Sequence, residues 1–542
     1  MQNNRTSRAF FLAALSLGVL NLSPALAQSP DKWGAHLDLE GKLGTERNLG
    51  EGGLFLPLYQ TPDTLVFGDL RMRFDDNESH EANVGAGVRR MLGSGWNIGG
   101  YGYFDRRESP YDNYFNQITV GAEALGRDVD LRLNSYWAIG DRSRAVDSLG
   151  EASISGSSIT MRGGEERSMS GFDAEVGWRV PLFDAEADKQ LRFYVGGYRF
   201  TADDVESIQG PRARVDFTMN ELPFLWEGSR LSLGAEWQHD DPRGSQAFAG
   251  LRLRIPLQHE ASAPRLTAQA QRMTDTVIRD IDVVTRAGAF GPVETASRTA
   301  SGQAITVLTS AANDGAALQT GLDTAGTNST VVLSGTFTTT STTTLQSGQT
   351  VTSGTGLQVI SPSGRVATMR AGNATINGSP GAATATIAMA NNSTLSGMTI
   401  NDTENNATVN AIGITASGVS GAHIIGNTVV STNNGVGGTA HGIMVVSGSS
   451  NVLVSGNSVT VANNSGSTAI GVQVNTSSAT VTGNSLSAIR SSTGGGTFGH
   501  THLQDATILT GSTGNSVVAG PCSTSGTNSG SVSYTNAANC GP

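Results

Sequence analysis

The sequence is poor in positive charge. It carries a formal net charge of −11 at pH 7, and only three of its 542 residues are lysine. Proteins that bind nucleic acids usually present a basic face, because the phosphate backbone of the nucleic acid is negatively charged. We therefore expect no nucleic-acid partner.

Apolar runs of helical length are also scarce. The chain begins with a basic start, an apolar stretch over 9–22 and an Ala-Leu-Ala tripeptide at 25–27, which is a pattern typical of a cleavable export signal. The residues that mark the predicted cleavage site are Ala25, Ala27 and Gln28. No later segment supplies a run of about 18 apolar residues, so residence in a membrane would have to come from strands.

Cysteine is limited to Cys522 and Cys540. In an exported chain, two cysteines near one terminus most often form a disulfide. Closing a loop of this length stabilises a fold by about 3 kcal/mol in the chain-entropy model. The alternative, a metal ion bound by the pair, lacks further ligands at a suitable spacing, so we predict the disulfide and no metal or other cofactor.

Charged residues become rare after about residue 300. Beyond that point the only basic residues are Arg365, Arg370 and Arg490. The acidic residues there are Asp314, Asp323, Asp402, Glu404 and Asp505. This change in composition predicts a domain boundary near residues 290–300.

The first half shows segments in which apolar and polar residues alternate with period two. In 128–138, Leu131 and Leu133 share one face while Asp130 and Arg132 share the other. Such strands suit a closed barrel with lipid outside and a polar lumen inside, whereas a soluble sandwich with one wet face is the alternative. The twelve predicted strands are 34–44, 52–59, 64–74, 81–90, 95–105, 114–125, 128–138, 171–182, 191–201, 211–220, 229–238 and 245–257.

The lengths of the connections agree with a barrel. Outer-membrane barrels have short periplasmic turns and longer external loops, and an even number of strands returns both ends to the periplasm. The turns near Gly93 and Gly126 are short, whereas the longest connection, 139–170, follows the seventh strand. The longest connection is therefore expected outside the cell.

Several segments of this half resemble the translocator barrel of the inverse autotransporters, the intimin and invasin family. They are LEGKLGTER at 39–47, LFLPL at 54–58, GYGYFDRR at 100–107, YFNQ at 114–117, VGAE at 120–123, RMTD at 272–275 and RDID at 279–282. The resemblance implies a twelve-stranded barrel in the outer membrane, a linker that threads its lumen and a C-terminal passenger exported to the cell surface. It also implies insertion by the outer-membrane insertion machinery, assisted by periplasmic chaperones.

The chain departs from the larger members of that family in two respects. Almost nothing separates Gln28 from the first strand, so the peptidoglycan-binding module that some members carry is not expected. Tandem immunoglobulin-like repeats are not found either, so the receptor specificities of the best-known members do not carry over.

The segment 263–285, which follows the last strand, is expected to form a short amphipathic helix. Its apolar residues Met273, Val277, Ile281 and Val284 recur every three or four positions among Arg and Asp residues. Two locations are open for this helix. It is either an ordinary connection at the barrel exit or a plug inside the pore, where its charges would pair with charges of the lumen.

The second half contains an internal repeat. Gly-Asn pairs at 426–427, 456–457, 483–484 and 514–515 recur at spacings of 30, 27 and 31 residues. Gly413, Gly442 and Gly471 keep the same phase at spacings of 29 residues. Repeats of this length, made of short apolar strands and turns, predict a parallel β-helix, which we expect to be right-handed. Asn suits such turns because it tolerates a left-handed backbone, and stacked copies hydrogen-bond between coils; the series is Asn427, Asn457, Asn484 and Asn515.

Both ends of this β-helix are expected to be covered. The segment 311–353 resembles the amphipathic opening of right-handed β-helices and would cover the first coil. The loop closed by Cys522 and Cys540 would cover the last coil, where an open edge would otherwise invite aggregation.

Some right-handed β-helices are polysaccharide lyases or hydrolases, whose chemistry needs clustered carboxylates or Ca²⁺. Here only Asp402 and Glu404 lie close together, in what resembles a solvated turn, while His441 precedes a coil and His500 and His502 fall in a predicted loop, 494–503. We therefore assign no catalytic, cofactor-binding or metal-binding residue. We expect a passenger that binds a cell-surface or glycan ligand, an adhesin; a carbohydrate-active enzyme and a self-associating passenger without a specific ligand are the alternatives.

The sequence thus predicts an all-β chain located in the cell outer membrane, with outer-membrane lipid around its barrel and its passenger on the cell surface. The predicted parts are a signal peptide (1–27), a 12-stranded antiparallel transmembrane barrel (28–258), a pore or linker segment (259–299) and the β-helical passenger (300–542).

Overall fold

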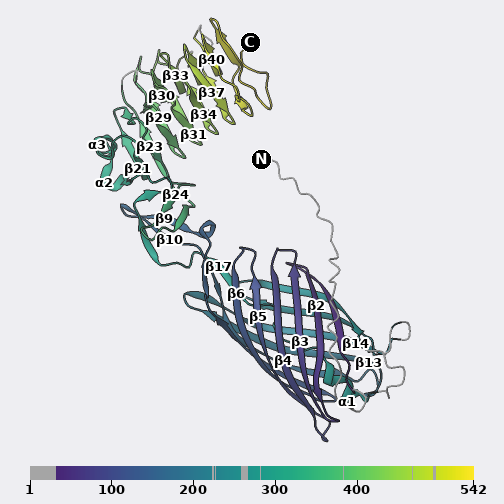
Figure 1. Ribbon diagram of the computed structural model, residues 1–542. Helices are drawn as coiled ribbons and strands as arrows, with labels where there is room; N and C mark the ends of the chain where they lie inside the picture. The colour runs from purple at the N-terminus through teal and green to yellow at the C-terminus, as the bar shows by residue number, and fades with distance from the viewer. Residues whose placement is uncertain are drawn as a thin grey trace.

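A computed structural model describes residues 32–222, 225, 228–257, 266–280, 282–381, 384–466, 468–491 and 496–541. It shows a barrel and a stack of short strands, joined by small sheets beside one end of the barrel (Figure 1). The predicted signal peptide with its cleavage site lies outside the described residues. Residue 258 of the predicted barrel lies outside them as well, as do residues 259–265 and Ile281 of the predicted pore segment.

Twelve antiparallel strands close into a barrel, which confirms the predicted architecture. β1 pairs with β2 on one side and with the last strand, β16, on the other, so every barrel strand has two neighbours. Closure satisfies the backbone polar groups that a membrane cannot hydrate. The strands are β1 (His36–Gly44), β2 (Leu49–Gln60), β3 (Thr64–Asp75), β4 (His80–Met91), β5 (Asn97–Glu108), β6 (Tyr114–Leu125), β7 (Val129–Ile139), β12 (Ser170–Val180), β13 (Lys189–Ala202), β14 (Val205–Asn220), β15 (Arg230–Asp240) and β16 (Gly244–Pro256).

The alternation in the sequence sorts side chains between the two surfaces of the barrel. Leu131 and Leu133 point outward and are 45% and 54% exposed, whereas Asp130 and Arg132 of the same strand point inward and are 0% and 6% exposed. The apolar outer surface suits hydrocarbon, and the charged inner surface forms a lumen.

The longest connection, between β7 and β12, is folded rather than irregular. It contains a hairpin, β9 and β10, and two further short strands that form small sheets with segments from later in the chain. The elements of this external loop are β8 (Ser143–Ala145), the 3₁₀ turn η1 (Asp147–Leu149), β9 (Glu151–Ser155), β10 (Ser158–Arg162) and β11 (Glu165–Ser168). From the segment after the pore, β17 (Thr285–Gly288) pairs with β11 and β18 (Val293–Ala296) pairs with β10, whereas β19 (Arg298–Thr299) pairs with β24 (Gln358–Ile360) at the other edge of the sheet.

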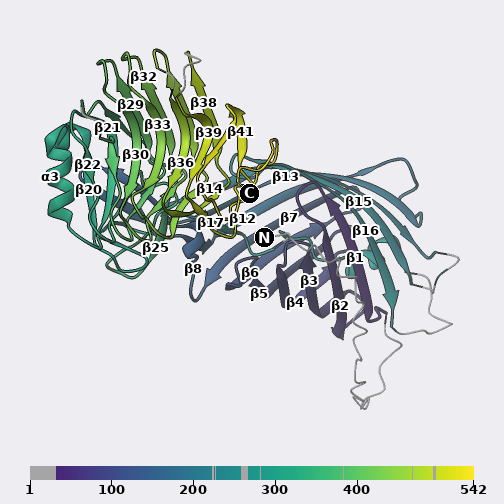
Figure 2. The same cartoon turned by 90° about the horizontal axis from the view of Figure 1, so that it is seen from above.

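The second half is a parallel β-solenoid, as the repeats predict. Strands from successive coils pair in register and lie side by side (Figure 2). One sheet contains β40-β37-β34-β31-β28-β23-β21 and continues through the long β21 into β26-β29-β32-β35-β38-β41, and a second contains β22-β27-β30-β33-β36-β39-β42. An apolar core of Val, Ile, Leu and Ala side chains runs along the inside of the coils.

The strands of this half are short because each coil turns after a few residues. They are β20 (Ile305–Thr309), β21 (Thr330–Thr339), β22 (Thr343–Thr344), β23 (Thr350–Thr352), β24 (Gln358–Ile360), β25 (Val366–Met369), β26 (Ala374–Gly378), β27 (Ile387–Ala388), β28 (Thr394–Ser396), β29 (Thr399–Glu404), β30 (Ala411–Ser417), β31 (His423–Ile425), β32 (Thr428–Asn433), β33 (Ala440–Val446), β34 (Val452–Ser455), β35 (Ser458–Asn463), β36 (Ala469–Asn475), β37 (Ser478–Thr482), β38 (Ser485–Arg490), β39 (Phe498–Gln504), β40 (Thr507–Ile508), β41 (Ser516–Ala519) and β42 (Cys522–Ser525).

Helices are few and short. They are α1 (Ala268–Gln271), the 3₁₀ turn η2 (Arg272–Thr274), α2 (Ser310–Asn313) and α3 (Ala316–Ala325). Among the residues that the structure describes, no helix combines the length and the apolar character needed to span a bilayer. α3 covers the first end of the solenoid, where Leu318 and Leu322 are buried in the apolar core.

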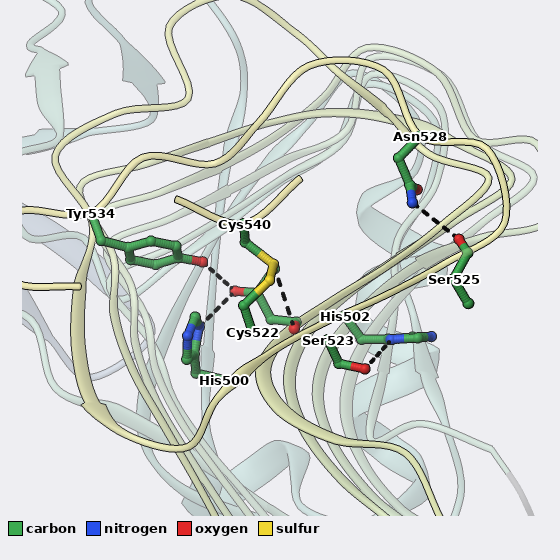
Figure 3. Close-up of a disulfide and its surroundings, with 9 residues drawn as sticks. His500, His502, Cys522, Ser523, Ser525, Asn528, Tyr534 and Cys540 are labelled. Atoms are coloured by element: carbon green, nitrogen blue, oxygen red, sulfur yellow. Dashed lines mark hydrogen bonds between the residues drawn. A yellow bond between two sulfur atoms is a disulfide. The ribbon is translucent and has the colours of Figure 1, made fainter. Parts of the chain in front are cut away.

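The far end of the solenoid carries the disulfide between Cys522 and Cys540 (Figure 3). Cys540 is fully buried and belongs to the apolar core of the stack. Beside it the hydroxyls of Thr501 and Tyr534 hydrogen-bond each other at 2.5 Å, and the ring of His500 meets the Tyr534 ring edge-on. The last coil is thus covered by a cross-linked loop.

Candidate functional site: the lumen and its linker

The segment 266–285 runs through the lumen of the barrel. Its start lies near the periplasmic turns, where the indole of Trp33 donates a hydrogen bond to the carbonyl of Ala270. Its end lies at the external side, where Arg47 of the first external turn pairs with Asp282 at 2.7 Å. Of the two locations left open by the sequence, the plug inside the pore is therefore the one observed.

The expected amphipathic helix is wrong. Within this segment only α1 and η2 are helical, and its described residues from 275 to 285 have no helical structure. Met273 and Val277 instead insert into an aromatic cluster of the lumen that contains Phe67, Tyr101 and Tyr103. The spacing of these apolar residues reflects pockets in the lumen wall rather than one face of a helix.

An extended chain inside a protein needs partners for its backbone groups, and here the lumen wall supplies them. Arg89 donates to the carbonyls of Met273 and Asp275, and Arg71 donates to that of Val277. Further donors to linker carbonyls are Asn97 to Gln269, Arg230 to Gln271, Tyr101 and Asn134 to Ile278, and Arg107 to Val283. The wall also accepts hydrogen bonds from two linker amides, those of Asp280 and Val283, through Tyr136 and Glu81.

The charged side chains of the linker also form ion pairs with the lumen wall. Arg272 makes two hydrogen bonds of 2.7 Å to the carboxylate of Asp130, which is fully buried. Arg279 pairs with Asp105 at 2.9 Å, and this carboxylate is also fully buried. Buried pairs of this kind contribute little net stability, but breaking one is strongly destabilising. The linker is therefore bound specifically by side chains of the lumen wall.

The linker does not fill the lumen completely. A cavity of about 290 Å³ lies beside the linker. Among the residues that line it are Lys42, Arg212, Arg230, Arg252 and Arg254, which come from β1 and from β14 to β16. The pore thus contains a bound segment of its own chain next to a cavity lined by charged side chains.

In the passenger, the repeated asparagines form an inner ladder. Asn457 accepts hydrogen bonds from the backbone amide (2.9 Å) and the side-chain amide (3.1 Å) of Asn427. It donates in turn to Asn484 at 2.9 Å and to the carbonyl of Ile424 at 2.9 Å. Asn484 continues the ladder to Asn515, and all four side chains are at most 1% exposed.

One part of the sequence-based interpretation of these turns needs correction. The residue with a left-handed backbone is the glycine before each asparagine, with φ of 62° at Gly426 and 66° at Gly456. The asparagine itself is not among the residues with positive φ. Glycine supplies the turn conformation, and asparagine supplies the contact between coils.

The two neighbouring acidic residues of the passenger do not lie in a solvated turn. Asp402 and Glu404 belong to β29 and are 0% exposed, with side chains inside the coil. Thr386 donates a hydrogen bond to Asp402, and the amide of Gly381 donates to Glu404 at 3.2 Å. Burial raises the pKa of Asp402 to about 7, and the nearby charge of Glu404 acts in the same direction.

This carboxyl makes the stability of the passenger depend on pH. Because its folded pKa lies above the ordinary value of 3.8, its protonated form favours folding, and that contribution is lost as pH rises from about 4 to about 7. The measurement is the free energy of unfolding in urea at pH 8 and at pH 5. On lowering the pH from 8 to 5, we expect this free energy to increase by about 2 kcal/mol more for wild type than for Asp402→Asn. Asp323→Asn on the exposed side of α3 is the control and is expected to leave the pH profile unchanged. Parallel pH profiles of wild type and Asp402→Asn would contradict the assignment.

The histidines also lie in strands rather than in a loop. His500 and His502 belong to β39 and His441 to β33, and all three are at least nine-tenths buried. Burial lowers the pKa of His441 and of His500 to about 4 and that of His502 in the same direction. Within the described part of the chain no three His, Cys, Asp or Glu side chains are grouped closely enough to hold a metal ion.

Two features of the site have no counterpart among the sequence predictions. The first is an exposed asparagine ladder, in which Asn464 donates to Asn434 and Asn434 donates to Asn405, each at 2.8 Å. The second is the pairing of the external loop with the passenger. The Asn-Asn pairs at 405, 433 and 463 were a usable signal for the first, whereas the second joins distant segments and leaves no local signal.

A closed barrel with an apolar outside, a charged lumen and its own chain threaded through that lumen defines a translocator that stays attached to what it exports. The family model for the inverse autotransporter β-domain matches residues 22–286. The match identifies an inverse autotransporter β-domain in this part of the chain, so the protein is an outer-membrane autotransporter with a β-helical passenger at the cell surface.

The other comparisons add only distant likenesses. No curated protein matches the chain. Among solved structures, one from work on the in-meso crystallization of membrane proteins shares 17% identity over 46% of this chain and 99% of its own, with a TM-score of 0.34. The translocator domain of the autotransporter NalP from Neisseria meningitidis shares 9% identity over 42% of this chain and 90% of its own, with a TM-score of 0.22. The NanC porin shares 9% identity over 41% of this chain and 100% of its own, with a TM-score of 0.27.

Proposed function

We propose that this protein is a surface adhesin that exports its own passenger through the barrel and then remains anchored by the linker in the lumen. The passenger binds neutral glycans through a row of hydroxyl side chains on the outer face of the sheet that runs from β21 to β41. Assembly by the outer-membrane insertion machinery and periplasmic chaperones follows from the family.

The hydroxyl row is the observation that carries the proposal. Its members occupy one register position of successive paired strands, namely Thr336, Thr375, Thr399, Thr428, Ser458, Ser485 and Ser516. None of the seven is buried. Within the described residues, no hydrogen bond joins any of these hydroxyls to another protein group, so each is available to a ligand.

The chemistry of this row favours a neutral, hydroxyl-rich partner. Adjacent strands are about 4.8 Å apart, so the row presents a donor and an acceptor at each such step. The passenger has few charged residues with which to bind a charged polymer. A polysaccharide laid along the row would find a hydroxyl at every coil.

An enzymatic passenger has less support. The only acidic residues that lie close together in its sequence, Asp402 and Glu404, are fully buried inside a coil, whereas glycosidic bond cleavage needs carboxyl groups that reach the substrate. We therefore propose a binding passenger without catalytic residues.

The test removes hydroxyls without changing the shape of the sheet. We expect the combined variant Thr399→Val, Thr428→Val and Ser458→Ala to weaken glycan binding by about a hundredfold, since three lost hydrogen bonds at about 1 kcal/mol each sum to about 3 kcal/mol. The measurement is binding of cells displaying the full chain to a glycan array. The control is Thr394→Val, Ser455→Ala and Thr480→Val, which removes three hydroxyls from the other arm of the same sheet.

Equal binding by the two variants would show that the row is not the binding surface. Release of new reducing or unsaturated ends from pectin or alginate by the displayed protein would instead favour the enzyme.

A further inference from the structure

The external loop between β7 and β12 forms one sheet with the beginning of the passenger. The strand order is β18-β10-β9-β25-β24-β19, so the hairpin of the barrel lies between β18, which follows the pore segment, and the passenger strands β25 and β24. β10 pairs with β18 antiparallel and β9 pairs with β25 parallel. The two edge strands, β18 and β19, are separated only by Ser297. Because the two edge strands are almost consecutive in sequence, the sheet must curl so that its two edges lie close together.

This sheet encloses an apolar cluster to which both parts contribute. The loop provides Ala152, Ile159 and Met161, which are 7%, 1% and 2% exposed. The following segment and the first coils provide Ala296, Val332, Val359, Ala367 and Met369. Neither part can bury these side chains alone, because a two-stranded hairpin has no opposite layer.

The loop backbone is shaped to receive the passenger strand. The carbonyl of Gly150 accepts a hydrogen bond from the amide of Thr368 at 3.1 Å. A Cβ atom at Gly150 would lie 2.3 Å from the carbonyl oxygen of Val366, which is closer than real contacts allow. The approach of β25 thus depends on a glycine in the barrel loop.

The base of the loop is held by the barrel itself. Glu166, which is 1% exposed, accepts hydrogen bonds from Ser109 at 2.6 Å and Asn113 at 2.8 Å, both in a neighbouring external turn. Within the loop, β8 pairs with β11. These contacts involve no passenger residue, so the base of the loop is ordered by groups that are present before the passenger emerges.

The order of the chain matches the order of these contacts. After the pore segment, β17 adds to β11 and β18 adds to β10, and β24 and β25 complete the sheet only after the first strands of the solenoid, β20 and β21, have followed. A parallel stack is slow to start, because its first contacts join residues far apart in sequence. A fixed hairpin at the pore exit removes much of this cost.

From these observations we infer that the external loop, residues 140–169, is a folding template for the passenger. It acts by β-strand addition, and its ligand is the segment 285–369 of the same chain. This inference rests on the proposed export through the barrel, and it assigns a second activity to the barrel beside transport and anchoring.

The test compares one substitution at two neighbouring positions of β10. Ile159 faces the apolar cluster, whereas Thr160 alternates to the other face and is only half-buried. Full-length protein in detergent is exposed to a denaturant concentration that unfolds the passenger and leaves the barrel closed, as checked by its mobility on unheated gels. Refolding after dilution and unfolding are both followed by pulse proteolysis.

We expect Ile159→Ala to slow refolding of the passenger by about tenfold and to change its unfolding rate by less than about twofold, because contacts made by a template exist in the transition state. Thr160→Ala should leave both rates near those of wild type. If Ile159→Ala refolds at the wild-type rate and unfolds faster, the template inference is wrong. The loop would then stabilise the folded passenger without speeding its folding.

Surface display on cells separates this inference from the export function. The absence of surface passenger in Thr160→Ala or in wild type, with the barrel folded, would contradict export itself. Normal display of Ile159→Ala with an unchanged refolding rate would contradict the template alone.

Discussion

Replacing Asn457 with alanine is expected to destabilise the passenger by about 3–5 kcal/mol. The substitution leaves the backbone amide and the side-chain amide of Asn427 without their acceptor, and it removes a donor to Ile424. Each buried polar group left without a partner costs about 1–3 kcal/mol. The free energy of unfolding of the passenger, measured in urea on the full-length protein, is the readout.

Asn434→Ala is the matched control. This residue stands in the exposed ladder, where it donates to Asn405 and accepts from Asn464, so water replaces both bonds when the side chain is lost. We expect a change within about 0.5 kcal/mol. Equal losses at the two positions would mean that burial does not decide the contribution of these ladders.

Replacing Arg272 with alanine is expected to loosen the linker and raise the conductance of the pore. The change removes two hydrogen bonds to Asp130 and one to the carbonyl of Gly126 at 2.6 Å, all inside the lumen. Breaking a buried ion pair costs about 3 kcal/mol or more, which raises the population of displaced linker by about two orders of magnitude. Single-channel recording in planar bilayers is the measurement, and long open events are the expected signature.

Arg286→Ala provides the comparison on the same segment. Its contact with Glu206 spans 3.8 Å and lies at the exposed outer end, where the Glu206 side chain is 64% exposed. Exposed pairs of this kind contribute about 1 kcal/mol or less. Wild-type conductance in the control, together with wild-type conductance in Arg272→Ala, would mean that the linker is not what closes the pore.

The barrel was predictable because membrane and lumen impose opposite demands on alternate residues. In β7 the apolar Leu131 and the charged Arg132 differ by one position and face opposite solvents, so a period of two appears directly in the sequence. The repeat of the passenger was predictable for a related reason, since each coil repeats the same inward positions. In both cases equivalent positions along the element share one environment, so the pattern repeats in the sequence.

The linker was mispredicted because its environment is not uniform. Met273 and Val277 occupy pockets between lumen side chains, and Arg89 and Arg71 satisfy the backbone that a helix would otherwise have satisfied internally. A sequence pattern cannot reveal partners that belong to distant strands. The pairing of β9 with β25 escaped prediction for the same reason.

The histidines illustrate a signal that was available and not used. Gly413, Gly442 and Gly471 follow each other at 29 residues, and the next step of 29 arrives at His500. The structure places His500 in β39, the strand that continues β30, β33 and β36. Extending the phase by one coil would have placed His500 and His502 in a strand instead of a loop.

The inner asparagine ladder also determines how such a passenger can vary in size. Each coil pairs with the next through the same strand edges and the same asparagine side chain. Differences in repeat length are accommodated in the turns between strands. A coil can therefore be duplicated or deleted without redesign of its neighbours, so the reach of the passenger changes in increments of about 4.8 Å. Natural diversification of this protein has a modular route that leaves the pore, the anchor and the terminal cap untouched.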